Sequence, residues 1–195
     1  MIYELAHIIR DKFSWLWDII EYLNSFLFNI RYGKKLKNID FKDVPEGYTV
    51  CPIKNISAKR LSFFFEQQSE EAFEYFHPHG FDEKSIKKLQ GNKAFLGYIL
   101  MQDQDVVGYV FLRCFFNGKC FRGKMVDYQH RGKGLGKILG TIANKVAYSI
   151  GLRMFATVSP GNMASLKSTK AVNEIKIIKQ LSNGDYYIEE LPKSE

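Results

Sequence analysis

The sequence predicts an α+β fold, with elements in the order β-α-α-β-β-β-α-β-α-β-β after a helical N-terminus. Short runs rich in β-branched and aromatic residues indicate the strands. Asn117-Gly118 between two such runs indicates a β-hairpin with a two-residue turn. The apolar positions from Leu135 to Ile150 recur with the spacing of a helix. The 195 residues, 46% of them hydrophobic, suffice for one domain with its own core.

The first 31 residues are expected to form an amphipathic helix, because their apolar side chains follow a heptad-like spacing. Its apolar surface is too large for a lone solvated helix. Either it docks on the domain or on a second copy of the chain, or residues 2–30 make a peripheral membrane contact. Four acidic residues disfavour anionic lipid: Glu4, Asp11, Asp18 and Glu21. Residues 32–37 are expected to be a basic, solvated linker, so that residues 1–40 precede a domain of residues 41–195.

The elements of that domain follow from apolar patterns and from breaker residues. Ser57 is the expected N-cap of the first helix. Helices are expected at 57–68, 70–76, 82–89 and 135–150. Strands are expected at 48–53, 94–101, 106–116, 119–126, 154–158, 175–180 and 186–190. A loop with the sequence His-Pro-His-Gly-Phe occupies residues 77–81.

The glycine-rich stretch from Gln129 to Gly136 joins a strand to a helix. Exposed backbone N–H groups and the positive end of the helix dipole form a phosphate site there, although an ordinary strand-to-helix turn is the alternative. The Walker pattern fails because Lys133 lies between glycines, and the dinucleotide pattern fails because residue 137 is Lys. The pattern that does fit is R-x-x-G-x-G, met by Arg131, Gly134 and Gly136.

A second motif follows about 30 residues later, where Asn162 leads into Met163-Ala164-Ser165-Leu166 at the start of the next helix. The two motifs together resemble the GNAT acetyltransferase superfamily, over roughly residues 48 to 190. The resemblance implies a mixed, mostly antiparallel sheet flanked by helices, with acetyl-CoA as co-substrate. It also implies that the strands ending near Val126 and Val158 splay apart to take the pantetheine arm.

The resemblance assigns cofactor-binding roles to three groups of residues. The pyrophosphate would lie on Gln129, Arg131, Gly132, Lys133, Gly134, Leu135 and Gly136. Backbone N–H groups near Met125 and Val126 would stabilise the thioester oxygen. Asn162 and Ser165 would touch the pantetheine arm, and Asn162 serves equally well as a helix N-cap. No metal site is expected, because His77 and His79 lack a recognisable ligand spacing.

The chain departs from the family at two positions. Thr157 stands where many protein N-acetyltransferases carry Glu, and Thr169 stands where many members carry a general-acid Tyr. Both departures weaken a protein-acetylation role and leave the base open. The candidates for the catalytic base are His79, His77 and Asp127, because an imidazole or a loop carboxylate can take a proton from an amine. A surface loop and a solvated carboxylate are the alternatives.

A two-residue turn at Asn117-Gly118 would pair Arg113 with Arg122 and place both on one sheet face with Lys124. Three cations so close repel unless an anion lies among them. They form either an anion site for the acceptor or a solvated face of long side chains. A longer turn would shift the register and separate them.

The net charge of +7 leaves nucleic acid, a membrane surface or an anionic small molecule as partners. Nucleic acid is not expected, because no helix carries a dense Lys/Arg stripe. Three cysteines without a C-x-x-C pattern, and no signal peptide or apolar span, predict a cytoplasmic protein, with membrane association as a further expectation.

The function expected is acetyl-CoA-dependent N-acetyl transfer to a small amine, with a nucleotide-linked amino sugar as the leading acceptor. The alternatives are a protein or peptide amine acetyltransferase, and a CoA-binding module without turnover.

Overall fold

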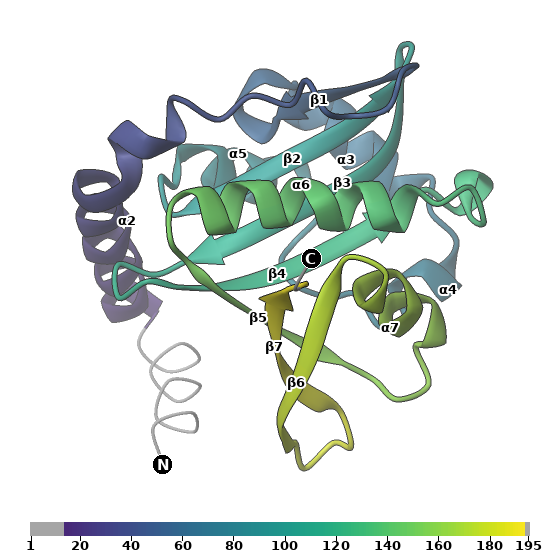
Figure 1. Cartoon of the computed structure of the whole chain (residues 1–195). Helices are drawn as coiled ribbons and strands as arrows, with labels where there is room; N and C mark the ends of the chain where they lie inside the picture. The colour runs from purple at the N-terminus through teal and green to yellow at the C-terminus, as the bar shows by residue number, and fades with distance from the viewer. Residues whose placement is uncertain (1–13, 194–195) are drawn as a thin grey trace.

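A computed structural model describes residues 14–193 of the chain (Figure 1). A seven-stranded sheet in the order β1-β2-β3-β4-β5-β7-β6 forms its centre. Only β4 and β5 pair in parallel, so the predicted mixed, mostly antiparallel sheet is confirmed. The strands are β1 (Tyr48–Pro52), β2 (Phe95–Gln102), β3 (Asp105–Cys114), β4 (Lys119–Val126), β5 (Arg153–Val158), β6 (Asn173–Gln180) and β7 (Tyr186–Pro192).

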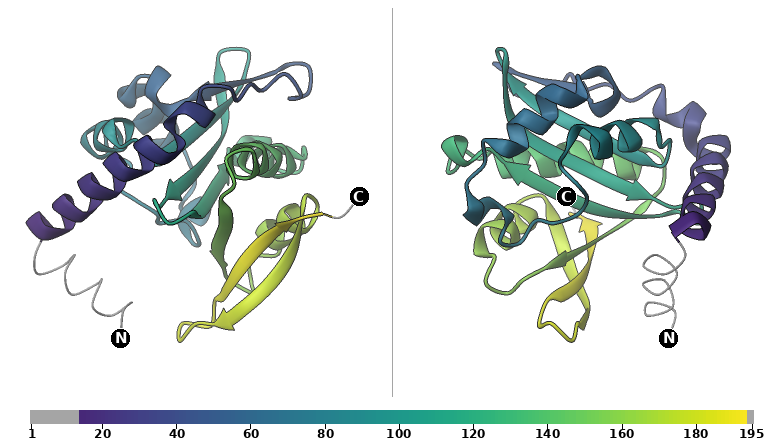
Figure 2. Two further views of the ribbon diagram at one scale, coloured as in Figure 1. Left: turned by 60° about the vertical axis from the view of Figure 1, so that its left-hand side comes forward. Right: turned by 180° about the vertical axis from the view of Figure 1, so that it is seen from behind.

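Helices cover both faces of the sheet (Figures 1 and 2). The helix after β4 and the one after β5 lie on one face, and the short helices between β1 and β2 lie on the other. The longest of the described helices, residues 14–36, stands at the end of the sheet where the β3–β4 hairpin turns. The helical segments are α2 (Ser14–Leu36), η1 (Ile53–Asn55), α3 (Ala58–Glu66), α4 (Glu70–Phe73), α5 (Glu83–Gly91), η2 (Tyr128–His130), α6 (Leu135–Ser149) and α7 (Met163–Lys170).

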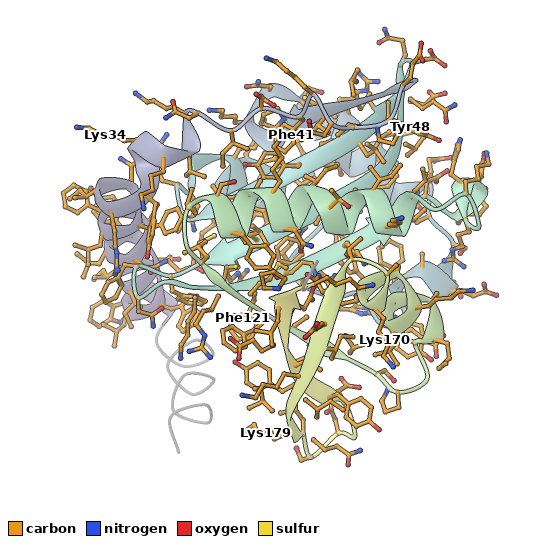
Figure 3. The ribbon with its side chains drawn as sticks, in the orientation of Figure 1. Lys34, Phe41, Tyr48, Phe121, Lys170 and Lys179 are labelled. Atoms are coloured by element: carbon orange, nitrogen blue, oxygen red, sulfur yellow. The ribbon has the colours of Figure 1, made fainter. Side chains whose placement is uncertain are left out.

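The sheet opens between β4 and β5. These strands pair only where Lys119 to Phe121 lie beside Arg153 to Phe155. Beyond that point β5 turns away with β6 and β7, and Figure 3 labels Phe121 beside the place of divergence. The rings of Phe121 and Tyr187 stack there, with centroids 5.9 Å apart. The splay expected between the ends near Val126 and Val158 is therefore present.

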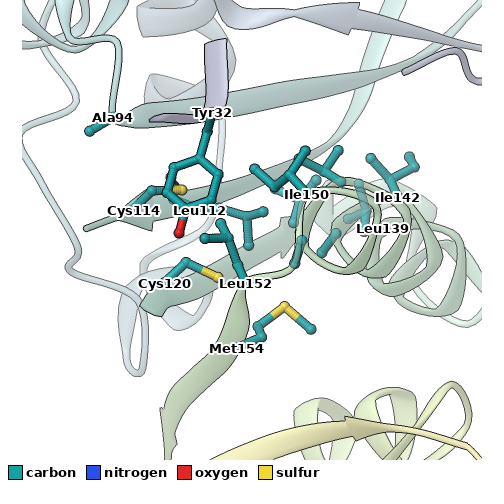
Figure 4. Close-up of a cluster of buried hydrophobic side chains, with 14 of the residues drawn as sticks. Tyr32, Ala94, Leu112, Cys114, Cys120, Leu139, Ile142, Ile150, Leu152 and Met154 are labelled. Carbon is teal, nitrogen blue, oxygen red and sulfur yellow. Dashed lines mark hydrogen bonds between the residues drawn. The ribbon is translucent and has the colours of Figure 1, made fainter. Parts of the chain in front are cut away.

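The core on the α6 face joins helix, sheet and α2 (Figure 4). Leu139 and Val146 of α6 are fully buried there, as are Cys114 and Cys120. Phe28 and Tyr32 of α2 complete this core, with ring centroids 4.9 Å apart. A second core on the opposite face is built by Leu61, Phe65, Ile86, Ile99 and Tyr109.

Helix α2 differs from its prediction at its C-terminal end. It continues to Leu36, so the prediction that residues 32–37 form a solvated linker is wrong. The reason is Tyr32, which is 4% exposed and packs in the core. Residues 1–13, with Glu4 and Asp11 and the first apolar positions, lie outside the described residues. The division of the chain at residue 40 stays a prediction.

The β3–β4 hairpin has a longer turn than its Asn-Gly sequence predicts. Phe115 N donates to Lys119 O at 2.8 Å, which leaves residues 116–118 as a three-residue loop. Gly118 has a φ of +86°, the left-handed residue that such loops require. The register therefore shifts by one, and Arg113 pairs with Phe121. The predicted cluster is wrong: Arg113 lies on the face opposite Arg122 and Lys124.

Candidate functional site

The loop between β4 and α6 leaves a row of backbone donors open. Gly132 and Gly134 have φ values of +79° and +80°, which L side chains rarely adopt, and these turns lead the chain into α6. Within the described chain, none of the N–H groups of residues 131–136 donates a hydrogen bond. Together with the positive end of the α6 dipole, these groups suit a phosphate.

The side chains of this loop add positive charge at its surface. Arg131 and Lys133 are exposed, and Arg131 lies 4.0 Å from the exposed Glu71 carboxylate. Gln129 is also exposed and donates to the Tyr128 hydroxyl at 2.9 Å. Leu135, in contrast, is 1% exposed and anchors the first turn of α6 in the core. The buried Leu135 thus holds the end of the loop in place, while the backbone N–H groups and the two cations lie at the surface.

Gly136 is a glycine for a packing reason. A Cβ at this position would lie 3.1 Å from the Ser168 Cβ, because α7 crosses α6 closely at that point. One turn later, a Cβ at Gly140 would lie 2.8 Å from Val172 Cγ2. The two glycines let the segment from α7 to β6 approach the N-terminal half of α6.

The edge of β4 that faces the splay carries unpaired donors. Asp127 N donates to Val107 O of β3 at 3.0 Å, and successive N–H groups of a strand point in opposite directions. The N–H groups of Val126 and Lys124 therefore point toward β5, which has diverged at this level. By the same alternation the N–H of Met125 points to β3. Of the two residues predicted to offer N–H groups here, Val126 fits and Met125 does not.

A buried ion pair bridges the splay just beyond the last β4–β5 pair. Arg122 Nε of β4 donates to Glu190 Oε1 of β7 at 2.7 Å, and the two side chains are 3% and 1% exposed. Arg122 Nη2 also donates to Thr169 Oγ1 at 3.2 Å. Asn173 Nδ2 donates to the other Glu190 oxygen at 2.8 Å. All partners of Arg122 are thus internal, so it does not offer the anion site predicted for it.

Lys124 lies beside this ion pair on the same face. Its Nζ donates to Gly136 O at 3.0 Å, under the first turn of α6. Burial, with a smaller effect from the neighbouring Arg122 charge, lowers the pKa of Lys124 to about 7. The ammonium can therefore release its proton near neutral pH, which an exposed lysine cannot do.

Asp127 is the centre of a small hydrogen-bond network that the sequence did not reveal. Its Oδ1 accepts from Gln68 Nε2 at 2.9 Å, and its Oδ2 lies 2.6 Å from His130 Nδ1. Gln68 Oε1 also accepts from Tyr128 N at 3.0 Å. Both Asp127 oxygens are therefore occupied, and the network fixes the chain that enters the glycine loop. This geometry favours a positioning role for Asp127 over that of a base.

His79 lies in an aromatic cluster on the opposite face of the sheet. Its Nε2 is 3.0 Å from the Tyr109 hydroxyl and its Nδ1 is 2.9 Å from Gly80 O. Phe65, Phe81, Phe95 and Phe111 surround the ring. Burial lowers the pKa of His79 to about 4, so the ring is neutral and a weak base.

The two other predicted acceptor-side residues lie apart from each other. His77 is exposed, with its ring 6.4 Å from that of Phe73. Arg113 lines a groove of 530 Å³ between α2 and α5, together with His79. The loop of residues 77–81 therefore presents His77 to solvent and His79 to the core.

The second motif begins α7 as predicted. Asn162 Oδ1 accepts from Ser165 N at 3.0 Å, so the N-cap role of Asn162 is confirmed. Thr169, where the resemblance would place a tyrosine, is 1% exposed and is bonded to Arg122. Ser165 lies in the first turn of the helix. Contact of either residue with a pantetheine arm stays a prediction.

Among the described residues, no three His, Cys, Asp or Glu side chains are grouped so as to hold a metal ion.

No protein-family model matches this chain, and neither does any curated protein sequence.

Solved structures of similar shape include acetyltransferases. The ribosomal-protein-S5-alanine acetyltransferase from Vibrio fischeri is 17% identical, over 81% of this chain and 98% of its own, with a TM-score of 0.59. RimJ from Mycobacterium smegmatis, in complex with CoA-disulfide, is 16% identical over 74% of this chain and 81% of its own, with a TM-score of 0.58. The GNAT domain of S. lividans PAT is 19% identical, over 73% of this chain and 89% of its own, with a TM-score of 0.57. At these identities the likeness shows a shared fold.

Proposed function

Since the chain has the GNAT fold, we propose that it is an acetyl-CoA-dependent N-acetyltransferase whose acceptor is a small amine. The open row of N–H donors at residues 131–136, next to the splay of β4 and β5, carries this proposal. A diphosphate matches those donors in charge and in hydrogen bonding. CoA joins a diphosphate to an extended arm, and the splay offers that arm an unpaired strand edge.

In the proposed reaction a neutral amine attacks the thioester carbonyl. The C–N bond forms, the C–S bond breaks, the amine nitrogen loses one proton and the thiolate takes up another. The N–H groups of Val126 and Lys124, which point into the splay, are the donors best directed to stabilise the carbonyl oxygen as it gains charge. The Lys124 ammonium, with its pKa of about 7, adds a positive charge beside this edge.

The acceptor proposed is a nucleotide-linked amino sugar. Thr157 and Thr169, which replace the family's Glu and Tyr, support a small amine over a protein amine. The basic strand face no longer supports it, because Arg122 is buried in an ion pair, and Arg122 and Lys124 lie on the sheet face opposite Arg113. Arg113, beside the groove at α2, remains available to an anionic acceptor.

We also propose a cytoplasmic location with no nucleic acid partner. Cys51, Cys114 and Cys120 are free thiols, which supports a reducing compartment.

A thiol-release assay tests the reaction. Purified full chain is mixed with acetyl-CoA and with nucleotide amino sugars, polyamines or peptides, and CoA release is followed with a disulfide dye. Calorimetry in parallel measures CoA binding. Release with a sugar amine supports the full proposal, and release with another small amine supports the reaction but overturns the sugar. Release with peptides alone favours a protein acetyltransferase. CoA binding without release across the panel favours a module without turnover, and no binding overturns the proposal.

A further inference from the structure

Helix α2 carries a broad apolar face that no part of the described chain covers. Between residues 15 and 30 the exposed large side chains fall within an arc of about 160°, at ~100° per residue. The exposed fractions reach 71% at Tyr22 and 65% at Ile30. Five of these residues lie within 80° of one another and form the outward face, namely Trp15, Ile19, Leu23, Phe26 and Ile30, while Tyr22 lies at the border of the arc and also lines the groove toward α5.

The opposite side of α2 fixes the helix to the domain. Phe28 and Tyr32 are buried in the core. Asn24 Nδ2 donates to Cys114 O at 2.9 Å, and Arg31 Nη1 donates to Phe116 O at 2.8 Å. Ser25 Oγ accepts from Lys93 N at 2.8 Å. The helix is thus held in one orientation, and its outward face cannot turn inward to escape water.

The charges of α2 are sorted between its two sides. Asp18 and Glu21 lie on the domain side, where Asp18 accepts from Lys88 at 2.7 Å and both line the groove toward α5. The outward arc holds no acidic residue between 15 and 36. Lys34 lies on this arc beyond Ile30, and the exposed Lys37 follows directly after the end of the helix. Figure 3 shows Lys34 extending away from the body of the molecule. The acidic residues at 18 and 21 therefore do not oppose an anionic surface.

We propose that the outward face of α2 binds the surface of a bilayer that contains anionic lipid, independently of the acetyltransferase reaction. Tryptophan, tyrosine and phenylalanine suit the boundary between headgroups and acyl chains, and the two lysines suit lipid phosphates. A second copy fits less well, because a helix pair seals a narrow seam and this arc is wider. None of the described helices has the length and apolarity needed to cross a bilayer.

The two tryptophans of the chain provide an internal pair of probes. Trp15 is 63% exposed on the outward face, whereas Trp17 lines the groove on the domain side. W17F retains only Trp15, and W15F retains only Trp17. With vesicles of phosphatidylcholine and phosphatidylglycerol, Trp15 emission should shift to the blue and be quenched by brominated lipid, while Trp17 emission stays unchanged. No change at Trp15, or equal quenching of both, would overturn the proposal.

Vesicle co-sedimentation with paired variants tests the residues. F26S/I30S should lower the partition coefficient by about 100-fold or more, because two large side chains no longer leave water. The matched control is I177S/I178S on β6, where both isoleucines are also exposed, and it should bind as the parent does. K34Q/K37Q should weaken binding to the anionic vesicles by about 30-fold. Equal binding by F26S/I30S and the parent, or no binding by the parent together with a dimer in sedimentation velocity, would overturn the proposal.

Discussion

Removal of the Glu190 carboxylate should destabilise the protein far more than removal of any surface carboxylate. Glu190 accepts hydrogen bonds from Arg122 at 2.7 Å and from Asn173 at 2.8 Å. In E190L the Arg122 side chain, 3% exposed, keeps only Thr169 as a hydrogen-bond partner. Breaking one side of a buried ion pair costs about 3–5 kcal/mol, a large share of the ~5–15 kcal/mol that stabilises a typical domain.

Urea denaturation followed by circular dichroism measures this loss. The double variant R122M/E190L removes both charges, so it should recover at least half of the loss in E190L. D43A is the matched control: Asp43 accepts from Lys145 at 2.6 Å, but its side chain is 77% exposed. The free energy of unfolding of D43A should lie less than about 1 kcal/mol below that of the parent. If E190L loses no more free energy of unfolding than D43A, the buried bridge across the splay does not stabilise the fold as argued.

Three further predictions concern the glycine loop, Lys124 and His79. G134A should lower the free energy of unfolding by about 1–2 kcal/mol, because residue 134 has a positive φ, and it should raise KM for acetyl-CoA. The control G184A, with a φ of +87° in a distant turn, should lower the free energy of unfolding by a similar amount without changing KM. Equal changes in KM for the two variants would contradict the assignment of the loop. K124M should be more stable than the parent below pH 7 in urea titrations. That advantage should shrink from pH 7 toward about 10.5, because burial lowers the pKa of Lys124 to about 7 and the unfolded chain binds the extra proton in this range; a difference independent of pH would refute it. The His79 ring should remain neutral by NMR down to about pH 5, since its pKa is about 4, and the fold should lose stability as pH falls from 6.5 toward 4; a midpoint near 6.5 would show that the ring is exposed.

The fold could be predicted because its signals are local. The glycine loop ends in a helix whose apolar positions repeat at helical spacing, and Asn162 caps the next helix with its own side chain. The hairpin register could not be predicted, because Asn-Gly fits both a two-residue and a three-residue loop. Contacts from α2 accompany the longer loop: Phe116 N donates to Asn24 Oδ1 at 3.0 Å, across 92 residues of sequence. No local pattern contains that contact.

In the candidate site, too, the features set by local sequence could be predicted and those set by distant partners could not. The phosphate loop needs only its own glycines and the helix that follows, so a motif reveals it. The roles of Arg122 and Asp127 depend on partners from distant elements, Glu190 of β7 and Gln68 beyond α3. His79 appeared as a base because histidine titrates near neutral pH, but the aromatic rings that lower its pKa come from α3, β2 and β3. Sequence reveals the residue type, and the environment then decides its chemistry.

Strand β4 begins at the hairpin held by α2 and ends at the loop before α6, on opposite sides of the molecule in Figures 1 and 2. Its eight residues span about 26 Å, at ~3.3 Å per residue. With α2 resting on lipid, the glycine loop before α6 would open roughly one strand length away from the headgroups, toward the aqueous phase. Tethering would then confine the protein to a membrane surface, while the proposed acetyl transfer would take place too far from that membrane to reach amines embedded in it.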